Sequence, residues 1–313
     1  MPEGQAVEIR VEYEIAKDLG LAGALAYTLG TEADDSAPDG LIERAAAAAA
    51  RADVAVVVVG TNSSVESEGF DRTSLALPGR QDALVRAVAR ANPRTVVAVN
   101  SGSPVELPWR DDVAAILLTW FGGQEYGNAL TDVLTGAREP GGRLPTTWPA
   151  RQSDVPVLDV TPVDGKVRYD EGVHVGYRAW LRSGTAPGYP FGYGLGYTTW
   201  TVDRATATPE FGSGGTVEVR AEVTNTGGRA GKHIVQVYAS RAHTAVDRPA
   251  RWLVGHEAVR LAPGTTQTVN VTVPARAFAH WDEGTWAYEP GEFTLHVGSS
   301  VDNLPSSVPV HLR

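Results

Sequence analysis

The sequence predicts an α/β sandwich domain with a mostly parallel sheet, followed by an all-β sandwich of the immunoglobulin-like kind. Between residues 41 and 136, short apolar stretches alternate with helical ones, which is typical of a parallel sheet covered by helices. After residue 200 the helical pattern gives way to strands at short spacing with turn residues between them. With 313 residues, the chain is long enough for two domains that each have a core of their own.

The first 39 residues differ in character from those that follow. Residues 7–15 (VEIRVEYEI) alternate with the period of a strand, and residues 31–40 (TEADDSAPDG) are typical of an acidic, turn-rich linker. We therefore expect residues 1–39 to hold a β-strand remnant and a linker. The next stretch, residues 41–53 (LIERAAAAAARAD), predicts a helix because alanine has the highest helix propensity.

The α/β domain is predicted over residues 40–150. Residues 54–60 (VAVVVVG) are uniformly apolar and rich in valine, as expected for a parallel strand covered on both faces. Further strands are expected at residues 95–100 and 114–120, with helices at residues 79–92 and 124–136.

A long irregular stretch, residues 137–200, separates the two patterns. It is rich in proline, glycine and aromatic residues, and such a length is uncommon unless the segment is functional or lies across a neighbouring domain. We expect it to pack across both domains, and we assign residues 151–200 to a connecting segment and residues 201–313 to the all-β domain. The strands expected there lie at residues 216–227, 232–240, 250–264, 266–274, 291–300 and 308–313.

Composition excludes several classes of function. The formal net charge of −10 argues against a nucleic-acid partner, since phosphate binding requires clustered Lys and Arg. The absence of cysteine excludes disulfides and Cys-ligated zinc. No apolar run approaches the roughly 18–20 residues of a membrane span, and the first twenty residues lack the apolar core of a signal peptide. We expect a soluble chain with no membrane partner, either cytoplasmic or secreted.

Residues 61–79 (TNSSVESEGFDRTSLALPG) carry the densest charge near a predicted strand end. A loop that follows a buried parallel strand opens into the crevice where α/β sheets bind ligands. Glu66 and Glu68 are two residues apart, so in an extended segment both would point to the same side, where paired carboxylates can share acid and base roles. The alternative is a solvated acidic loop in which Asp71 and Arg72 form a surface ion pair. The pattern alone leaves both interpretations open.

Other site types have weaker support. Ser101 and Ser103 follow a predicted strand, but there is no G-x-S-x-G motif and only His174 lies outside the all-β region as a candidate base. The segment after residue 60 does not match G-x-G-x-x-G, no metal-ligand set stands out, and no cofactor is expected. Six aromatic residues are candidates for stacking on sugar rings, although aromatic residues more often belong to a core or an interface: Trp109, Trp120, Trp148, Trp180, Tyr177 and Tyr193.

Five blocks occur in an order that strongly resembles glycoside hydrolase family 3, the β-glucosidase family. The first runs from SEGFDR at residue 67 to ELPW at residue 109, and the others are ILLTWFGGQEYGNALTDVLTG, GGRLPTTWP, YDEGVHVGYRAW and YPFGYGLGYTTW. The resemblance covers the chain from about residue 40 to its end. It implies an (α/β)6 sandwich followed by a fibronectin type III-like domain, and it makes residues 1–30 similar to the tail of a PA14-type β module.

The resemblance also implies roles for the residues of the 61–79 loop. In the family, the glutamate of the E-G-[FY]-D-R block is the general acid/base, and this position is Glu68, with Glu66 as the second candidate. Phe70, Asp71, Arg72 and Trp120 are the expected substrate-binding residues. The nucleophilic aspartate belongs to a preceding (β/α)8 barrel, and nothing in this sequence resembles that barrel.

Taken together, these observations predict the C-terminal part of a retaining β-glucosidase-like hydrolase. Its expected partners are a β-glycoside substrate and the barrel, supplied in cis or in trans, and the chain by itself is expected to be inactive. The alternative is a non-catalytic carbohydrate-binding or scaffold protein built from the same two domains.

Overall fold

The structure is a computed structural model that describes residues 38–70, 72–159 and 161–313. The strand expected at residues 7–15 and the resemblance to a PA14-type module lie outside the described residues, as does Asp71. Within the described part, residues Asp39–Arg313 belong to one compact unit.

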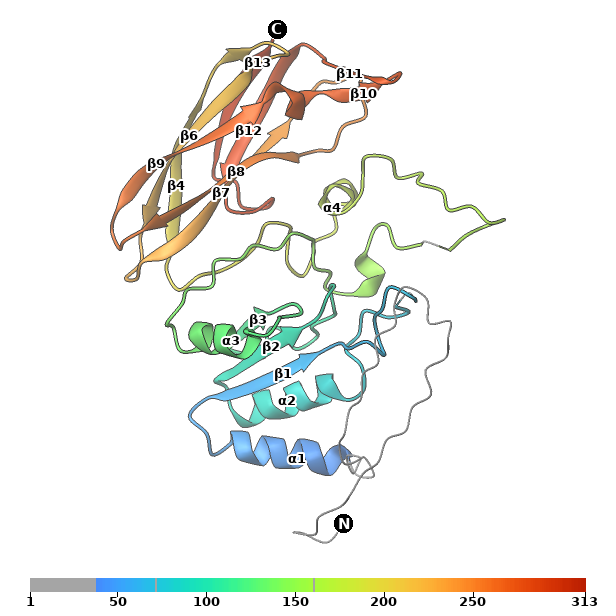
Figure 1. The fold of residues 1–313 in the computed structure, drawn as a ribbon, viewed down its shortest axis with the longest axis vertical. Helices are drawn as coiled ribbons and strands as arrows, with labels where there is room; N and C mark the ends of the chain where they lie inside the picture. Colours follow the sequence, from blue (N-terminus) through green and yellow to red (C-terminus); the bar gives the residue numbers. More distant parts are fainter. Residues whose placement is uncertain (1–37, 71, 160) are drawn as a thin grey trace, which may run out of the picture. The chain divides into compact units, whose positions relative to one another are not determined.

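The α/β part contains a three-stranded sheet in which all the strands are parallel, in the order β1-β2-β3 (Figure 1). The strands fall where the sequence predicts them, and a helix connects β1 to β2. The expected parallel α/β architecture is therefore confirmed. The elements are α1 (Pro38–Ala49), β1 (Ala55–Gly60), α2 (Gln81–Ala91), β2 (Thr95–Asn100), β3 (Ala115–Leu118) and α3 (Tyr126–Leu134).

The first helix begins inside the stretch that the sequence analysis assigned to the linker. Helix α1 starts at Pro38, three residues before the alanine-rich segment that predicted it. Proline suits the first turn because backbone N–H groups at this position have no acceptor within the helix, so nothing is lost when the residue has no N–H. Asp39 in the same turn interacts favourably with the helix dipole. The residues at the end of the linker therefore initiate the helix.

The valine-rich strand β1 is covered on one face only, so the expectation of burial on both faces is wrong. Ala55, Val57 and Val59 belong to a core cluster with residues of α1 and α2, whereas Val56 and Val58 are 48% and 58% exposed. Strand β1 lies at the edge of the three-stranded sheet, and α1 and α2 lie on the same side of it (Figure 1). Strand β1 therefore carries apolar side chains, Val56 and Val58, on a face that the described residues do not cover.

The irregular stretch of residues 137–200 is hydrogen-bonded to both the α/β part and the β-sandwich, as expected. On the α/β side, the indole N–H of Trp148 donates to the carbonyl of Val105. On the other side, the side-chain amide of Gln236 donates to the carbonyl of Gly192 at 2.9 Å, and the N–H of Leu253 donates to the hydroxyl of Tyr177 at 2.9 Å. The segment contains η1 (Gln152–Asp154) and α4 (Tyr177–Ser183), and α4 was not anticipated from the sequence.

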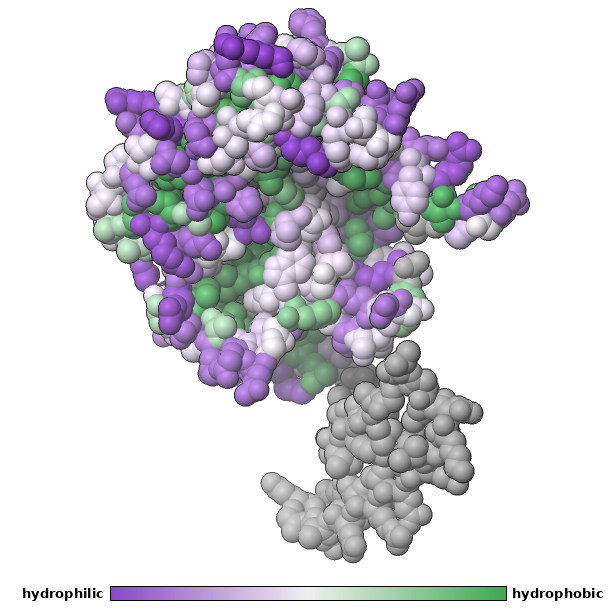
Figure 2. Space-filling view, turned by 45° about the horizontal axis from the view of Figure 1, so that its top comes forward, coloured by the Kyte–Doolittle hydropathy of each residue, from purple (hydrophilic) through white to green (hydrophobic). Residues whose placement is uncertain are grey.

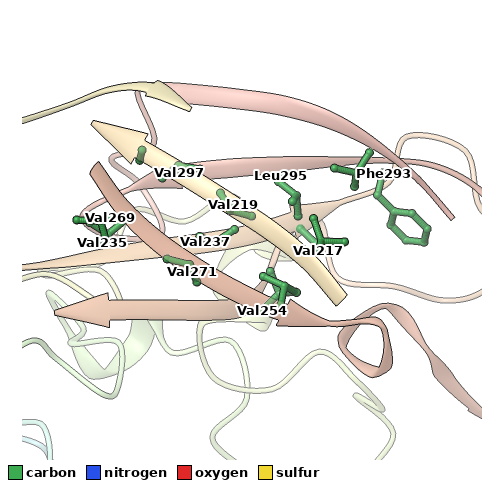
Figure 3. Packing of buried hydrophobic residues seen from close by; sticks show 14 of the residues in the cluster. Val217, Val219, Val235, Val237, Val254, Val269, Val271, Phe293, Leu295 and Val297 are labelled. Carbon is green, nitrogen blue, oxygen red and sulfur yellow. The ribbon is translucent and has the colours of Figure 1, made fainter. Parts of the chain in front are cut away.

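The C-terminal part is a β-sandwich, as predicted. One sheet has the order β5-β13-β12-β7-β8 and the other the order β4-β6-β9. Valines of β6 and β9 face Phe293, Leu295 and the valines of β7, β8 and β12 across the interior (Figure 3). Six of the strands correspond to predicted ones; the short or irregular strands β4, β5, β10 and β11 do not. Their bounds are β4 (Trp200–Ala207), β5 (Glu210–Phe211), β6 (Thr216–Asn225), β7 (Gly231–Ser240), β8 (Trp252–Leu261), β9 (Thr266–Pro274), η2 (Ala275–Phe278), β10 (His280–Asp282), β11 (Thr285–Ala287), β12 (Gly291–Gly298) and β13 (Ser306–Leu312).

Some large apolar side chains remain at the surface, and Figure 2 shows apolar patches between hydrophilic side chains on one face. None of the helices in the described ranges combines the length and apolar character required to cross a membrane.

Candidate active site

The three parallel strands end at the same edge of the sheet, and each is followed by a hydroxyl residue. Thr61 follows β1, Ser101 follows β2 and Thr119 follows β3. The side-chain amide of Gln81 fixes the exit of β1: it accepts from the N–H of Gly60 at 2.7 Å and donates to the carbonyl of Gly60 at 2.9 Å. The loop after β1 therefore leaves the sheet from a fixed point, at the edge where open α/β sheets bind ligands.

The carboxylate of Glu66 is held by residues of the loop after β2. Its Oε1 atom accepts from the N–H of Gly102 at 2.9 Å, and its Oε2 atom lies 3.3 Å from Oγ of Ser103 and 3.2 Å from Nη1 of Arg72. Only 15% of the Glu66 side chain is exposed. Both carboxylate oxygens are therefore engaged within the protein, which leaves this group poorly placed to exchange a proton with a substrate.

Arg72 connects Glu66 and Ser74 of its own loop to the loop after β2. Its Nη1 atom donates to Oγ of Ser103 at 2.8 Å and to the carbonyl of Pro104 at 3.3 Å, and its Nη2 atom donates to the carbonyl of Ser74 at 3.2 Å. The Arg72 side chain is only 9% exposed. The alternative of a solvated loop is wrong for this residue, because Arg72 forms a largely buried ion pair with Glu66.

Glu68 lies at the tip of a tight turn. Ser67 and Phe70 form an isolated antiparallel bridge, and Oγ of Ser67 accepts from the N–H of Gly69 at 3.1 Å, so Glu68 and Gly69 are the two central residues of the turn. Glu68 is exposed, whereas Glu66 is mostly buried. The chain turns between Glu66 and Glu68 instead of continuing as an extended segment, so the condition under which both carboxylates would point to the same side is not met.

The other expected substrate-binding residues are found in different settings. Phe70 is 47% exposed beside Glu68, Arg72 is buried in its ion pair, and Asp71 lies outside the described residues. Trp120 follows β3 with a φ of 53°, and its ring lies 6.1 Å from that of Trp148 in an edge-to-face arrangement. Phe70 and Trp120 therefore retain surface for a ligand, whereas Arg72 maintains the shape of the loop.

Two parts of the site were not anticipated from the sequence. A methyl group at Gly102 would come within 2.5 Å of Oε1 of Glu66 and within 2.8 Å of Cε2 of Phe121, so Phe121, which is 54% exposed, belongs to the same cluster. Ser103 was considered only as a nucleophile and instead positions Glu66 and Arg72. Ser103 comes from the loop after β2 and Phe121 from the loop after β3, and the proximity of Ser103 to Glu66 and of Phe121 to Gly102 has no local signature in the sequence.

A ring of three hydrogen bonds anchors the C-terminal half of the first loop. The N–H of Leu75 donates to the side chain of Gln152 at 2.8 Å, the N–H of Gln152 donates to the carboxylate of Glu106 at 2.6 Å, and the N–H of Glu106 donates to the carbonyl of Leu75 at 2.8 Å. Three segments distant in sequence, which contain Leu75, Glu106 and Gln152, are thereby fixed to one another.

Competing site types gain no support from the geometry. Nε2 of His174 is bonded to Oδ1 of Asp247 at 2.9 Å in the β-sandwich, so His174 is engaged away from Ser101 and Ser103. Trp109, Trp148 and Trp180 are each at most 7% exposed and serve as core residues, not as stacking surfaces. Within residues 38–70, 72–159 and 161–313, no group of three or more acidic or histidine side chains is arranged to hold a metal ion.

The candidate site is thus an exposed carboxylate on a braced turn, at the edge of the α/β sheet where ligands commonly bind. One carboxylate can give a proton to a leaving group or take one from water, but it cannot by itself both attack and protonate a substrate.

The chain belongs to glycoside hydrolase family 3. Residues 5–197 match the description "Glycosyl hydrolase family 3 C-terminal domain", and residues 233–301 match "Fibronectin type III-like domain". The predicted family and the predicted order of domains are thereby confirmed.

Several relatives are β-glucosidases of greater length. The chain is 39% identical over 315 residues to a β-glucosidase of Kluyveromyces marxianus, covering 98% of this chain and 37% of that protein. It is 40% identical over 292 residues to thermostable β-glucosidase B of Acetivibrio thermocellus, covering 92% and 39%. Among solved structures, DesR, a β-glucosidase from Streptomyces venezuelae in complex with D-glucose, superimposes with a TM-score of 0.83 at 36% identity, over 89% of this chain and 36% of that one. The chain therefore spans somewhat more than a third of the length of these relatives.

Proposed function

We propose that the chain supplies the general acid/base loop of a retaining β-glucosidase-like glycoside hydrolase, with Glu68 as the acid/base. The observation that supports this assignment is the different environment of the two candidate carboxylates. Glu66 is bonded through both oxygens to Arg72, Ser103 and Gly102, whereas Glu68 is exposed at the tip of the turn that Glu66 and Arg72 support. Glu66 is then a positioning residue.

The second carboxylate would come from a barrel domain outside this chain. Retaining glycosidases have two carboxyl groups about 5–5.5 Å apart, one of which attacks the anomeric carbon while the other protonates the leaving oxygen. Glu68 would begin as the acid, and its carboxylate would then take a proton from the water that hydrolyses the glycosyl-enzyme. The barrel and the sugar would enclose Glu68, and this desolvation would favour the protonated form that the first step requires.

Substrate contacts would come from side chains that remain exposed near Glu68. Phe70 and Trp120 are the candidates in this chain, together with Asp71, which follows Phe70 directly. Partly exposed aromatic rings suit the apolar faces of a sugar. We also propose the division into residues 40–150, 151–200 and 201–313; the separate cores of the α/β part and the β-sandwich support it. The relatives are named β-glucosidases, so a purely non-catalytic scaffold is not favoured.

The assignment can be tested in a chimera that joins the N-terminal region of the Kluyveromyces marxianus β-glucosidase to this chain. Loss of a general acid slows the first step most when the leaving group is poor. Glu68→Ala should therefore lower the rate on alkyl glucosides by about 10²- to 10⁴-fold and much less on activated aryl glucosides. Azide should restore turnover and yield a glycosyl azide of retained configuration, because a small anion can attack the glycosyl-enzyme without a general base. The matched control is Glu66→Ala; if this variant gives the azide product and Glu68→Ala does not, the two roles are reversed.

A further inference from the structure

Gln152 brings the connecting segment into contact with the loop that carries Glu68. It begins η1, and its side-chain amide accepts from the backbone N–H of Leu75 at 2.8 Å. Because the partner is an N–H donor, the amide oxygen, and not the amide nitrogen, faces Leu75. The two residues are 77 positions apart in the sequence, so this bond joins two regions that no local signal relates.

Leu75 is held at both of its backbone polar groups. Its N–H is bonded to Gln152, and its carbonyl accepts from the N–H of Glu106 at 2.8 Å. The carboxylate of Glu106 in turn accepts from the backbone N–H of Gln152 at 2.6 Å, a group at the start of a short helix that has no acceptor within that helix. Each of the three residues therefore fixes the other two, and loss of the Gln152 side chain would open the ring.

The ring rests on the core of the α/β part. Val105, which directly precedes Glu106, is 0% exposed, and Trp148, shortly before Gln152 in the chain, is 2% exposed. The indole N–H of Trp148 donates to the carbonyl of Val105. Trp148 also exchanges two backbone hydrogen bonds with Tyr189, at 2.8 and 3.0 Å. Gln152 and Glu106 therefore extend from well-fixed backbone, and they can hold the loop in place instead of moving with it.

A chain of bonded residues leads from Leu75 to the turn that carries Glu68. The carbonyl of Ser74, next to Leu75, accepts from Nη2 of Arg72 at 3.2 Å, and Arg72 is paired with Glu66 on the other side of the turn. Glu68 is exposed at the tip, so its position follows from the backbone of the loop.

We propose that Gln152 is a positioning residue for proton transfer: by holding Leu75, it keeps the loop in the position from which Glu68 protonates the leaving group. This role depends on the proposed assignment of Glu68 as the general acid/base. It makes the connecting segment part of the active site without requiring Gln152 to touch the substrate.

Replacement of Gln152 by methionine removes the acceptor and keeps a side chain of similar length. In the chimera described above, Gln152→Met should lower kcat/KM on alkyl glucosides by about tenfold, a fraction of the roughly 10²- to 10⁴-fold that general acid catalysis contributes. The effect on activated aryl glucosides should be much smaller, because a good leaving group needs little protonation in the first step. Gln267→Met is the matched control: Gln267 is exposed in β9, and its substitution should leave kcat/KM unchanged on both substrates.

A double-mutant cycle separates positioning from a general effect on folding. In a chimera that already carries Glu68→Ala, Gln152→Met should cause no further loss on alkyl glucosides, because no acid remains to be positioned. A residue that only stabilised the protein would instead lower the rate on both substrates alike, and its effect would add to that of Glu68→Ala.

The contact itself is measured separately in the 313-residue chain, by hydrogen exchange of the Leu75 amide followed by NMR. This amide should exchange about tenfold faster in Gln152→Met, the factor that loss of one hydrogen bond typically gives, and at an unchanged rate in Gln267→Met.

Either of two results would overturn the role of Gln152 alone: unchanged exchange at Leu75, or a loss of rate that is equal on the two substrates and additive with Glu68→Ala. If Glu68→Ala itself lacks the leaving-group dependence, the acid/base assignment fails and the role of Gln152 fails with it.

Discussion

Oε2 of Glu66 lies 3.2 Å from Nη1 of Arg72, and the two side chains are only 15% and 9% exposed. This largely buried ion pair connects the start and the end of the turn that presents Glu68. It is also bonded to Ser103 in the loop after β2, so the position of the exposed carboxylate depends on a second strand of the sheet.

We expect Glu66→Gln to destabilise the chain by about 1–3 kcal/mol, because it leaves the buried guanidinium of Arg72 without its counter-charge. The free energy of unfolding in urea measures the effect. The control is Asp53→Asn, which removes an exposed partner of Arg94 and should cost less than about 0.5 kcal/mol. Equal effects of the two substitutions would contradict a structural role for the buried pair.

Glu68→Gln should leave the free energy of unfolding within about 0.5 kcal/mol of that of the unmodified chain, because an exposed side chain away from special features contributes little to stability. In the chimera described above, the same substitution should lower activity on alkyl glucosides strongly. Stability without activity is the signature of a catalytic residue, and a parallel loss of both would indicate that Glu68 has a structural function.

Gly102→Ala should destabilise the loop after β2 by about 1–3 kcal/mol, because the added methyl group would overlap the carboxylate of Glu66 and the ring of Phe121. Gly123→Ala is the matched control, since a methyl group there meets nothing within 4 Å. Urea unfolding of the two variants gives the comparison; a Gly102→Ala variant as stable as the control would show that the cluster can rearrange at no cost.

The sequence predicted the strands better than it predicted their surroundings. The run of valines in β1 was sufficient to locate a strand, because its β-branched residues and its bounding glycine are local signals. Whether Val56 and Val58 are covered depends on what packs against the sheet, which the run itself does not encode. Helix α4 is only seven residues long and lies among glycines and prolines, so its helical period was too short to detect.

The same distinction applies to the candidate site. The family block suggested Glu68 as the acid/base, but the different environment of Glu66 arises from a turn at Ser67–Phe70 and from contacts of Glu66 with Gly102 and Ser103, more than thirty residues away. Arg143, which belongs to the GGRLPTTWP block, affects the pKa of His233 from a distant part of the sequence, and the block itself does not indicate that the two residues are close. Contacts between distant segments are a property of the fold, and periodicity and short motifs do not report them.

The chain alone should not hydrolyse p-nitrophenyl β-glucoside, because the proposed nucleophile lies outside it and one carboxylate cannot complete a double displacement. The measurement is release of p-nitrophenol by the purified chain, with Glu68→Gln as the control for a contaminating activity. Turnover by the unmodified chain that disappears in the Glu68→Gln variant would show that the chain contains a nucleophile after all.

His233 should make the stability of the chain sensitive to pH between about 6.5 and 4. Its pKa is lowered from 6.5 to about 4 in the folded protein, first by burial and then by the charge of Arg143, so the unfolded chain takes up a proton at a higher pH than the folded chain does. The stabilisation is fully present above pH 6.5 and is lost as the pH falls towards 4. At one pKa unit per 1.36 kcal/mol, the loss from this residue is about 3 kcal/mol.

This contribution can be isolated by comparing the fall in unfolding free energy from pH 7 to pH 4 between the unmodified chain and a His233→Gln variant. The fall should be smaller in the variant by about 3 kcal/mol, since glutamine does not titrate. His256→Gln, at an exposed histidine in β8, is the matched control. Equal falls in the unmodified chain and the His233→Gln variant would mean that the ring is solvated in the folded protein.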